Sequence, residues 1–368
     1  MESPLEKTTH PELSIQANIA QAETLPSYWY SRPEVVRDEK KQIFAKTWQL
    51  VGHLELVQKK GDFFTVEVAG EPLVILRDQD EKLQGFFNVC RHRGGPLAKG
   101  KGNCAALQCE YHSWTYALNG TLKFTPEFDG AECFSKENFS LRKIKIDTFG
   151  PLIFVNLLGS EPDLSTYIGE IAAEIQHIDL NSLTFFKRHI YEINCNWKVY
   201  VDNYLEGYHI PRVHPGLMRE IDYSKYREDV RTYHSRQFAP IRNQNSIYKR
   251  NQEEGDTTGA LYYWLFPNLM WNIYPDNLQF NIIMPDGPNK TLTIFDWYVP
   301  NNLTEKMQKD FEESFAFSHS VQQEDIWICE QVQKGLNSVS YDRGRYSVKR
   351  ESALHHFHTL YAQYMNKP

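Results

Sequence analysis

The stretch NWKVYVDNYLEGYHIPRVH, residues 196 to 214, brings Glu206, His209 and His214 close together in the chain. Glu206 and His209 are three residues apart, so on a helix their side chains would share one face. Pro211 predicts the end of that helix, because the residue before a proline avoids the α conformation. A turn at this point would bring His214 back beside His209, where two imidazoles can bind one metal ion. Two histidines do not identify a metal, and each could also be an ordinary buried polar residue.

The overall composition is that of a globular protein. The 368 residues suffice for two domains, and 41% are hydrophobic and 24% charged. The net charge of -7 and the lack of a lysine- or arginine-rich run argue against nucleic acid as a partner. The N-terminal sequence lacks the apolar core of a secretory signal, and no apolar run is long enough to cross a membrane. We therefore expect a cytoplasmic enzyme whose six cysteines are ligands or buried thiols rather than disulfides.

A small unit of β-strands is predicted upstream of this stretch. The pattern over Pro33–Thr47 indicates a helix, after which the pattern becomes that of strands. Asp62–Asp78 is typical of a hairpin, and Gln84–Val89 is typical of a third strand. Asn119-Gly120 predicts a tight turn between two further strands, and PLIFVNLLG at residues 151–159 predicts a last one.

Two short loops of this unit carry the same pair of residue types. CRHRGG supplies Cys90 and His92, and CEYH supplies Cys109 and His112. The alternatives are a structural zinc site with two cysteine and two histidine ligands, or four unconnected residues. A zinc finger takes both cysteines from one short spacing and both histidines from the other, whereas each loop here supplies one of each. The mixed pairs favour a [2Fe-2S] cluster in which one iron binds two thiolates and the other binds two imidazoles.

With these motifs the sequence resembles the Rieske proteins. Together with residues 196–214 it resembles the catalytic alpha subunit of a Rieske non-haem iron oxygenase, from about Trp29 to Tyr364. The resemblance implies an α+β fold. A small all-β Rieske domain (residues 45–158) is then inserted before a helix-grip-like catalytic domain (residues 159–368) with an antiparallel sheet flanked by helices. Residues 1–44 would pack with the catalytic domain.

By this resemblance His209 and His214 are two ligands of a mononuclear iron, and a carboxylate completes the site. Asp325 is the expected third ligand. It lies on a predicted late helix, VQQEDIWICEQVQKGL, in a buried stripe where an unpaired carboxylate would be costly. Glu324 is expected to point elsewhere, and the alternative for Asp325 is an ion pair with Arg345. The expected stripe consists of Asp325, Cys329, Val332 and Leu336.

The resemblance implies a different role for Glu206. In the family an acid at this place hydrogen-bonds a Rieske histidine across a subunit interface and so links the two metal centres. Most ring hydroxylases have aspartate there, whereas carnitine monooxygenase-like members have glutamate. The alternative is a solvated acid on the surface of a helix. Glu206 and the nearby Asn203 are the candidate catalytic residues.

No nucleotide site is predicted. Gly100–Ala105 fits the pattern G-x-G-x-x-A, but it lies between the cluster loops and opens no helix, and no P-loop is present. We therefore expect NAD(P)H to act only through a separate reductase or ferredoxin, with O2 as co-substrate. The resemblance also implies a head-to-tail homotrimer, in which the cluster of one subunit serves the iron of its neighbour.

Further elements are expected around the iron. Residues 163–177 indicate a helix, and Arg188–Asn194 indicates a strand that leads into residues 196–214. Residues 243–259 predict a mobile surface loop. After this loop, LYYWLFPNLMWNIYP, NLQFNIIMP and LTIFDWYVP indicate consecutive antiparallel strands that form the sheet over the iron.

The expected substrate is a small quaternary ammonium compound of the choline, carnitine or betaine type, because the resemblance is nearest to choline and carnitine monooxygenases. An aromatic ring or aromatic carboxylate is the alternative substrate. From another class, the alternative is a non-enzymatic Rieske electron carrier or a zinc-binding structural protein, neither of which needs His209, His214 and Asp325 together. Six aromatic residues could form a cage for a cation or be ordinary core. They are Tyr204, Tyr208, Tyr263, Trp264, Phe266 and Trp271.

Overall fold

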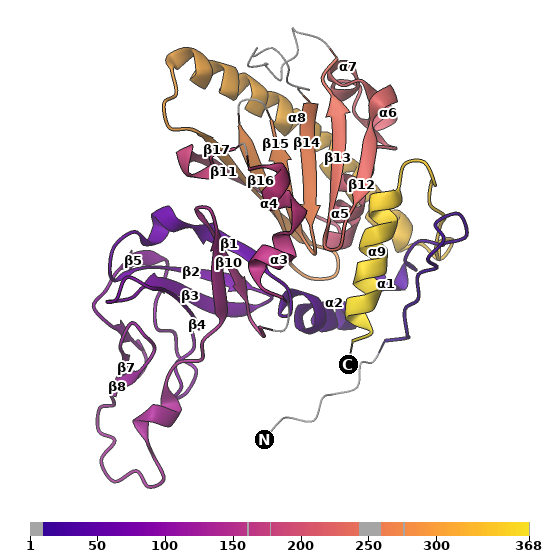
Figure 1. Cartoon of the computed structure of the whole chain (residues 1–368). Helices are drawn as coiled ribbons and strands as arrows, with labels where there is room; N and C mark the ends of the chain where they lie inside the picture. The colour runs from indigo at the N-terminus through magenta and orange to yellow at the C-terminus, as the bar shows by residue number, and fades with distance from the viewer. Residues whose placement is uncertain (1–9, 160–161, 177, 243–258, 275–276, 368) are drawn as a thin grey trace. The chain divides into compact units, whose positions relative to one another are not determined.

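The computed structural model of the chain describes residues 10–159, 162–176, 178–242, 259–274 and 277–367. The chain divides into two compact units (Figure 1). Residues 44–169 form the small unit, and residues 1–43 together with 170–368 form the large unit. The domain limits expected from the sequence, 45–158 and 159–368, stay a prediction. None of the described helices is both long and apolar enough to cross a membrane.

A tight hairpin forms the centre of the small unit. Strands β2 (Asp62–Val68) and β3 (Glu71–Arg77) pair antiparallel, as the sequence pattern predicts. The turn falls on Ala69 and Gly70, whose φ angles are +57° and +81°. Positive φ at both central residues is the geometry that matches the twist of the paired strands.

Alternate side chains of β3 pack into two different hydrophobic cores. Val74 and Leu76 belong to the core around the cysteine loops, and Leu73 and Ile75 belong to the core on the other face. A strand that is buried on both faces is apolar at every position, which explains the run Leu-Val-Ile-Leu. The other elements of the unit are β1 (Gln49–His53), β4 (Leu83–Phe87), β5 (Lys101–Asn103), β6 (Leu107–Gln108), β7 (Thr115–Tyr116), β8 (Leu122–Phe124), β9 (Lys145–Phe149), β10 (Leu152–Asn156), the 3-10 turns Leu54–Val57 and Lys136–Phe139, and α3 (Leu164–Ile168).

A seven-stranded antiparallel sheet forms the body of the large unit, and its strand order is β11-β17-β16-β15-β14-β13-β12. The predicted antiparallel strands are confirmed, and together with the small β unit they confirm the α+β fold class. LYYWLFPNLMWNIYP forms two strands, because the chain turns between Leu265 and Leu269. The strands are β11 (Leu183–Ile193), β12 (Arg227–Val230), β13 (His234–Pro240), β14 (Gly259–Leu265), β15 (Leu269–Ile273), β16 (Leu278–Pro285) and β17 (Thr291–Pro300).

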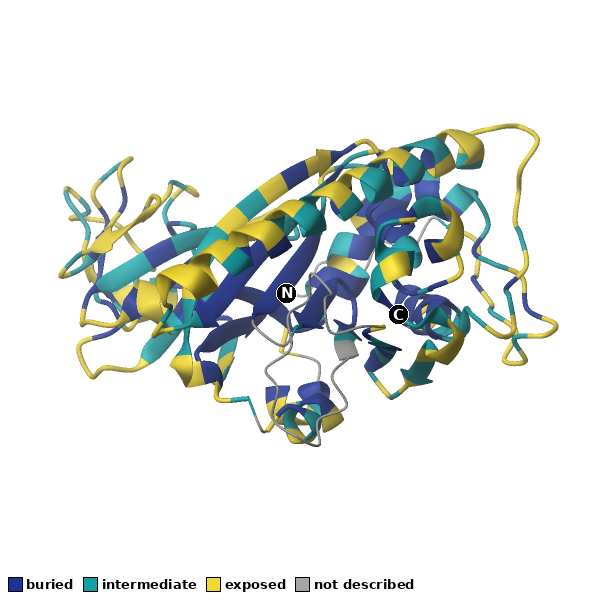
Figure 2. Cartoon of the chain, turned by 90° about the horizontal axis from the view of Figure 1, so that it is seen from above, coloured by how far each residue is buried: buried dark blue, intermediate teal, exposed yellow. Residues whose placement is uncertain are grey.

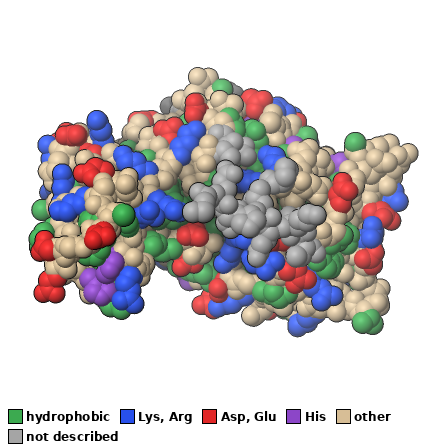
Figure 3. Space-filling view, turned by 90° about the horizontal axis from the view of Figure 1, so that it is seen from below, with side chains coloured by type: hydrophobic (Ala, Val, Ile, Leu, Met, Phe, Trp, Pro, Cys, Tyr) green, Lys and Arg blue, Asp and Glu red, His purple; other side chains and the backbone are tan. Residues whose placement is uncertain are grey.

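Helices cover this sheet. The central strands β15 and β16 are largely buried, whereas the edge strands β11 and β12 and the outward turns of the long helix α8 are partly exposed (Figure 2). On the face shown in Figure 3, lysine and arginine side chains are interspersed with aspartate and glutamate. The helices of the unit are α1 (Tyr28–Ser31), α2 (Pro33–Glu39) continued by a π-helical turn (Lys40–Phe44), α4 (Glu170–Glu174), α5 (Trp197–Tyr204), α6 (Ile210–Val213), α7 (Leu217–Glu220), the 3-10 turns Leu180–Ser182 and Tyr223–Lys225, α8 (Glu305–Leu336) and α9 (Ser352–Met365).

Three expectations about local structure are wrong or lie outside the described residues. The helix predicted over residues 163–177 is broken at Gly169, which has a φ of +55°. Helix α5 ends at Tyr204 instead of extending to His209, and Pro211 lies in the first turn of α6, where a missing N–H costs nothing. Of the predicted loop at residues 243–259, residues 243–258 lie outside the described residues.

The buried face of α8 is more polar than expected. Cys329 is buried, but Val332 of the predicted stripe is exposed, and Gln322 and Gln333 are buried instead. These amides make specific hydrogen bonds. Gln322 accepts a bond from the Tyr200 hydroxyl (2.7 Å), and Gln333 accepts one from the backbone N–H of Asn196 (2.7 Å). These bonds pair the carbonyl oxygens of both glutamines next to α5, while Nε2 of Gln322 has no partner among the described residues.

A buried carboxylate on α2 connects this helix to α5 and α9, which are distant in the sequence. Glu39 and Lys198 form an ion pair, and both side chains are completely buried. Glu39 also accepts hydrogen bonds from Trp197 Nε1 (2.8 Å) and the Tyr361 hydroxyl (2.7 Å). Burial lowers the pKa of Lys198, while Glu39 acts in the opposite direction. We refer to these four residues as the Glu39 cluster, which connects α2, α5 and α9.

Candidate metal centres and substrate cavity

Two loops of the small unit each present one cysteine and one histidine. Cys90 follows β4, and its N–H donates to the carbonyl of Gly95 (2.8 Å), which closes the first loop. Cys109 follows β6, and its N–H donates to the carbonyl of Trp114 (2.9 Å) in the second loop. Both thiols are buried and neither forms a disulfide. The sequence motifs therefore meet at one place in the fold.

The histidines of the two loops face each other. The ring centroids of His92 and His112 are 4.7 Å apart, and His92 stacks on Trp114. The Nδ1 atoms of both histidines are buried without a hydrogen-bond partner among the described residues, which is costly unless a ligand binds them. Burial lowers the pKa of His92, as does the nearby His112, and this favours the neutral form that binds metals. Two buried thiols and two unpartnered imidazoles fit a [2Fe-2S] cluster.

A tyrosine that sequence reasoning missed also lies at this centre. The Tyr116 hydroxyl is 3.3 Å from Sγ of Cys90 and accepts a hydrogen bond from the N–H of Arg91 (3.0 Å). A hydrogen bond to a ligand sulfur adjusts the reduction potential of a cluster. The sequence signal is weak, because Tyr116 looks like an ordinary core residue of a short strand.

Gly95→Ala is expected to reduce the cluster content of the purified protein. A Cβ at this position would lie 2.8 Å from Sγ of Cys109 and 3.1 Å from Cβ of Tyr111, so the ligand loops would have to separate. Overpacking of this kind costs about 1–3 kcal/mol. Iron per chain and visible absorption measure the effect. Gly335→Ala is the matched control, since its Cβ would meet no atom within 4 Å. Equal cluster content in the two variants would contradict the assignment of this loop.

The second candidate centre lies in the large unit, where His209, His214 and Asp325 converge. One ligand atom from each of the three lies within 4.8 Å of the others. Oδ1 of Asp325 is 2.9 Å from Nε2 of His214 and 3.7 Å from Nε2 of His209. Asn203 Nδ2 donates to the same oxygen (2.7 Å) and so orients the carboxylate. Two histidines and one carboxylate on one side of a site are the donor set of a non-haem iron.

The remaining ring nitrogens of both histidines contact carboxylates. Nδ1 of His209 is 2.5 Å from Oε1 of Glu206, and Nδ1 of His214 is 2.7 Å from Oε2 of Glu324. These contacts turn both Nε2 atoms toward Asp325. Burial lowers the pKa of His214, but Asp325 and Glu324 outweigh this effect and raise the pKa overall. The expectation that Glu324 points elsewhere is therefore wrong, because its longer side chain reaches the far side of the same imidazole.

Two alternatives from the sequence are excluded by the observed contacts. Asp325 does not pair with Arg345, whose guanidinium donates to the carbonyl of Ala20 (2.7 Å). Glu206 is not a solvated surface acid, because its side chain is only 12% exposed. Its second oxygen accepts hydrogen bonds from the backbone N–H groups of Tyr208 and His209. Glu206 thus shapes the loop that carries His209.

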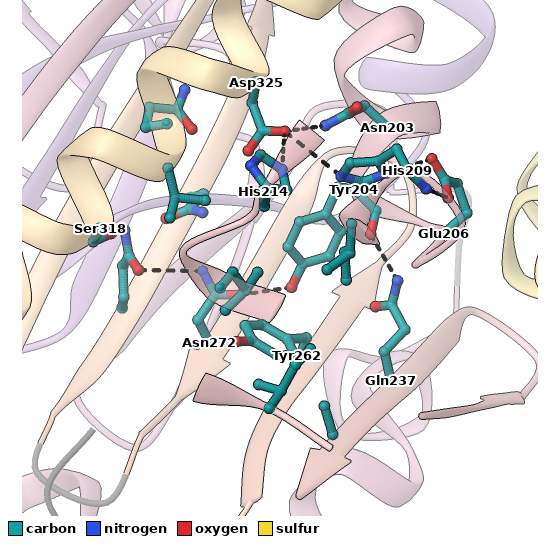
Figure 4. A pocket seen from close by; sticks show the side chains of 18 of the residues that line it. Asn203, Tyr204, Glu206, His209, His214, Gln237, Tyr262, Asn272, Ser318 and Asp325 are labelled. Atoms are coloured by element: carbon teal, nitrogen blue, oxygen red, sulfur yellow. Dashed lines mark hydrogen bonds and ion pairs between the residues drawn. The ribbon is translucent and has the colours of Figure 1, made fainter. Parts of the chain in front are cut away.

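A cavity opens onto this three-residue centre (Figure 4). It encloses about 840 Å³ of empty space, its open mouth included, which is enough for a small organic molecule. The Tyr204 hydroxyl donates to Oδ1 of Asn272 (2.6 Å) in its wall. The other lining side chains come from α5–α8 and from the sheet. They include Tyr200, Tyr226, Tyr262, Tyr274 and Phe295 among the aromatics, and Gln237, Asn272, Gln279, Asn281 and Gln322 among the amides.

The two candidate centres lie in segments of the chain that match two different known families. Residues 47–135 match the family described as Rieske [2Fe-2S] domain, and residues 180–367 match the family described as Ring hydroxylating alpha subunit (catalytic domain). The chain belongs to the Rieske non-haem iron oxygenases. The match to a catalytic domain excludes a non-enzymatic Rieske carrier and a zinc-binding structural protein.

Relatives of this Rieske oxygenase match over nearly the whole chain. Chloroplastic choline monooxygenase of Arabidopsis thaliana is 33% identical over 358 residues, which are 93% of this chain and 83% of the relative. The carnitine monooxygenase oxygenase subunit of Acinetobacter pittii is 31% identical over 356 residues, which are 95% of each chain. A crystal structure of the quaternary ammonium Rieske monooxygenase CntA with L-carnitine has a TM-score of 0.81, with 30% identity over 95% of this chain and 97% of that chain.

The family fixes the cofactors of the oxygenase as a [2Fe-2S] Rieske cluster and a mononuclear iron, which together supply electrons and activate O2. Electrons come from a separate donor protein. The observed residues fit both groups. Cys90, His92, Cys109 and His112 would hold the cluster, and His209, His214 and Asp325 would hold the iron.

The predicted substrate pocket of the oxygenase is wrong for five of its six aromatic residues. Only Tyr204 lines the cavity. Tyr208 is 61% exposed, and the Tyr263 hydroxyl donates to Glu174 of α4 instead (2.6 Å). The other three pack in the core, where Trp264 and Phe266 contact Phe357 of α9 and Trp271 contacts Phe280.

The alternation of side chains along β14 explains this error. Tyr262 lines the cavity, so its neighbour Tyr263 faces the opposite side of the sheet. Tyr263 pairs with Trp271 across the strands and Tyr262 pairs with Asn272, so each pair shares one face. The sequence shows this alternation, but it does not show which of the two faces meets the iron.

Proposed function

We propose that this oxygenase hydroxylates a small quaternary ammonium compound at an N-methyl group or an adjacent carbon. The observation that carries the proposal is the tyrosine-rich cavity that opens onto His209, His214 and Asp325. The faces of aromatic rings attract cations of this kind. The similarity to choline and carnitine monooxygenases supports the same substrate class.

The reaction consumes one O2, two electrons and two protons, places one oxygen atom in a C–H bond of the substrate and releases the other as water. The chain's own contribution is positional. Glu206 and Glu324 orient the two imidazoles, Asn203 orients Asp325, and the aromatic wall holds the substrate beside them. Hydroxylation of an N-methyl carbon gives an unstable carbinolamine that releases formaldehyde, and the electrons come from a separate reductase.

A substrate screen tests the proposed function. Purified oxygenase with a surrogate reductase is supplied with choline, carnitine, glycine betaine or aromatic acids, and O2 uptake and formaldehyde are measured. We expect substrate-dependent O2 uptake with at least one quaternary ammonium compound and no turnover of the aromatic acids. Product formation from an aromatic acid, with no response to any ammonium compound, would favour the aromatic alternative.

We also propose that the oxygenase acts as a homotrimer in which Glu206 hydrogen-bonds a cluster histidine of the neighbouring subunit and so links that subunit's cluster to the iron for electron transfer. Glu206 contacts His209 directly, and the adjacent Tyr208 is 61% exposed, so this loop reaches the molecular surface. The relative CntA is described with inter-subunit electron transfer. A cytoplasmic location is proposed as well, which agrees with six unpaired cysteines.

Glu206→Gln is expected to slow electron transfer to the iron by at least about tenfold, or roughly 1.4 kcal/mol on the barrier. The amide keeps the size of the side chain but loses the charge that holds imidazole N–H groups. Single-turnover kinetics with a pre-reduced cluster and saturating iron measure the rate.

Glu324→Gln is the matched control for the bridge. This substitution removes the carboxylate that contacts the other iron histidine, His214, and no bridging role is proposed for Glu324. Both variants should weaken iron binding about 10–100-fold. Only Glu206→Gln should slow transfer once iron is saturating, so equal transfer rates in the two variants would contradict the proposed bridge.

A further inference from the structure

The cavity wall contains amide side chains that are anchored at one end and, within the part of the chain that the structure describes, unpartnered at the other. Gln237 Nε2 donates to the carbonyl of Tyr204 (2.7 Å), which leaves its Oε1 without a partner. Gln322 Oε1 accepts from the Tyr200 hydroxyl (2.7 Å), which leaves its Nε2 without a partner. The Tyr204 carbonyl can only accept, so this bond fixes which way the Gln237 amide is turned, and the Gln322 amide is turned with its oxygen toward the Tyr200 hydroxyl. One end of each is therefore available as a defined acceptor or donor.

Two further amides on β16 also present an unpartnered polar atom. Gln279 Oε1 accepts from Asn272 Nδ2 (3.3 Å), and its own Nε2 has no partner among the described residues. Oδ1 of Asn281, two residues along the same face of the strand, is also unpartnered. Gln237, Gln279, Asn281 and Gln322 are each at most 3% exposed. A buried polar atom without a partner is unfavourable, so four of them around one cavity indicate a polar ligand.

The charges around the cavity indicate that the polar group of this ligand is not a carboxylate. Its described lining residues include no lysine or arginine, but they include the carboxylates of Glu206 and Asp325. Together with Glu324, three carboxylates contact the two iron histidines. A ferrous ion would neutralise two of these three negative charges. A substrate carboxylate in this cavity would lose its hydration and find no cationic side chain in the described wall.

We infer that the cavity selects a quaternary ammonium substrate whose far end is neutral and hydrogen-bonding, such as a hydroxyl or a primary amide, over one that ends in a carboxylate. The unpartnered ends of the four amides bind this end, since together they offer two donors and two acceptors. The inference rests on the proposed function and narrows its substrate class. It separates choline-like compounds from carnitine-like and betaine-like ones by the chemistry of the cavity wall.

The test compares γ-butyrobetaine with its primary amide, which have nearly the same size and the same ammonium group. Calorimetric titration of the holoenzyme gives the two dissociation constants, and O2 uptake with reductase gives the two kcat/KM values. We expect the amide to bind at least about tenfold more tightly. Equal or tighter binding of the acid overturns this inference alone. Failure of both compounds to bind, while an aromatic acid binds, overturns the proposed function itself.

Variants of Gln279 test the role of the amides. Gln279→Met removes the unpartnered donor at similar volume and should weaken binding of the amide compound at least about fivefold, with little effect on the acid. Gln279→Lys supplies the missing cation and should shift the preference toward the acid by at least about tenfold. Gln308→Met, the same substitution at an exposed position of α8, is the control. An unchanged ratio of the two dissociation constants in folded Gln279→Lys would overturn the inference.

Discussion

Asp325→Ala is expected to lower product formation by roughly a thousandfold or more, which corresponds to about 4 kcal/mol on the barrier. Its carboxylate is the group that lies close to Nε2 of both His209 and His214, so its loss leaves two imidazoles without the third ligand. The variant should lose most of its mononuclear iron and keep its Rieske absorption, because the cluster loops lie in the other unit.

The measurements are product formed per turnover, iron per chain and the visible spectrum. Glu312→Ala removes a carboxylate from an exposed position of the same helix and serves as the control. His209→Ala should behave like Asp325→Ala. Normal turnover in Asp325→Ala would mean that another residue completes the site, and loss of the Rieske spectrum would mean that the variant acts through the fold.

Glu39→Leu is expected to lower the free energy of unfolding by about 3–5 kcal/mol, because it leaves the buried ammonium of Lys198 without a partner. Trp197 and Tyr361 would also lose their acceptor. Urea denaturation monitored by tryptophan fluorescence measures the change.

The double variant Glu39→Leu/Lys198→Met should recover part of this loss, since the unpaired charge is gone while two donors still lack an acceptor. Asp286→Ala is the surface control. It breaks a half-exposed pair with Lys290 and should change the unfolding free energy by less than about 1 kcal/mol. If Glu39→Leu and Asp286→Ala lowered the free energy of unfolding by similar amounts, the Glu39 cluster would contribute little to stability.

Local patterns in the sequence predicted the parts of this protein that depend on neighbours in the chain. The cysteine and histidine loops and the hairpin at Ala69-Gly70 need only a few adjacent residues, and both form as expected. The strands after residue 259 were also predicted, because their runs of aromatic and β-branched residues are long.

The features that were missed depend on contacts between distant residues. Glu324 contacts His214, which is 110 positions away in the sequence. The amides of Gln237, Gln279 and Asn281 line one cavity because of the register of β13 to β16. Gln322 and Gln333 look like surface residues in the sequence, yet they are buried because α5 supplies their partners. Periodicity shows that a helix has two faces, but it does not show which polar groups the opposing helix offers.

The Glu39 cluster also has a consequence for the order in which the chain folds. Glu39 bonds to Trp197 at a separation of 158 positions and to Tyr361 at a separation of 322. During synthesis on the ribosome, residues 44–169 are complete and able to fold long before α9 exists, whereas Glu39 lacks the Tyr361 hydroxyl as a partner until α9 emerges. Proteolysis of nascent chains stalled before residue 352 should therefore cleave α2 while sparing the small unit, and protection of both would contradict this order. Glu39 thus reaches its native contacts later than the small unit that follows it in the chain, so the emergence of α9 from the ribosome is the step that closes the large unit.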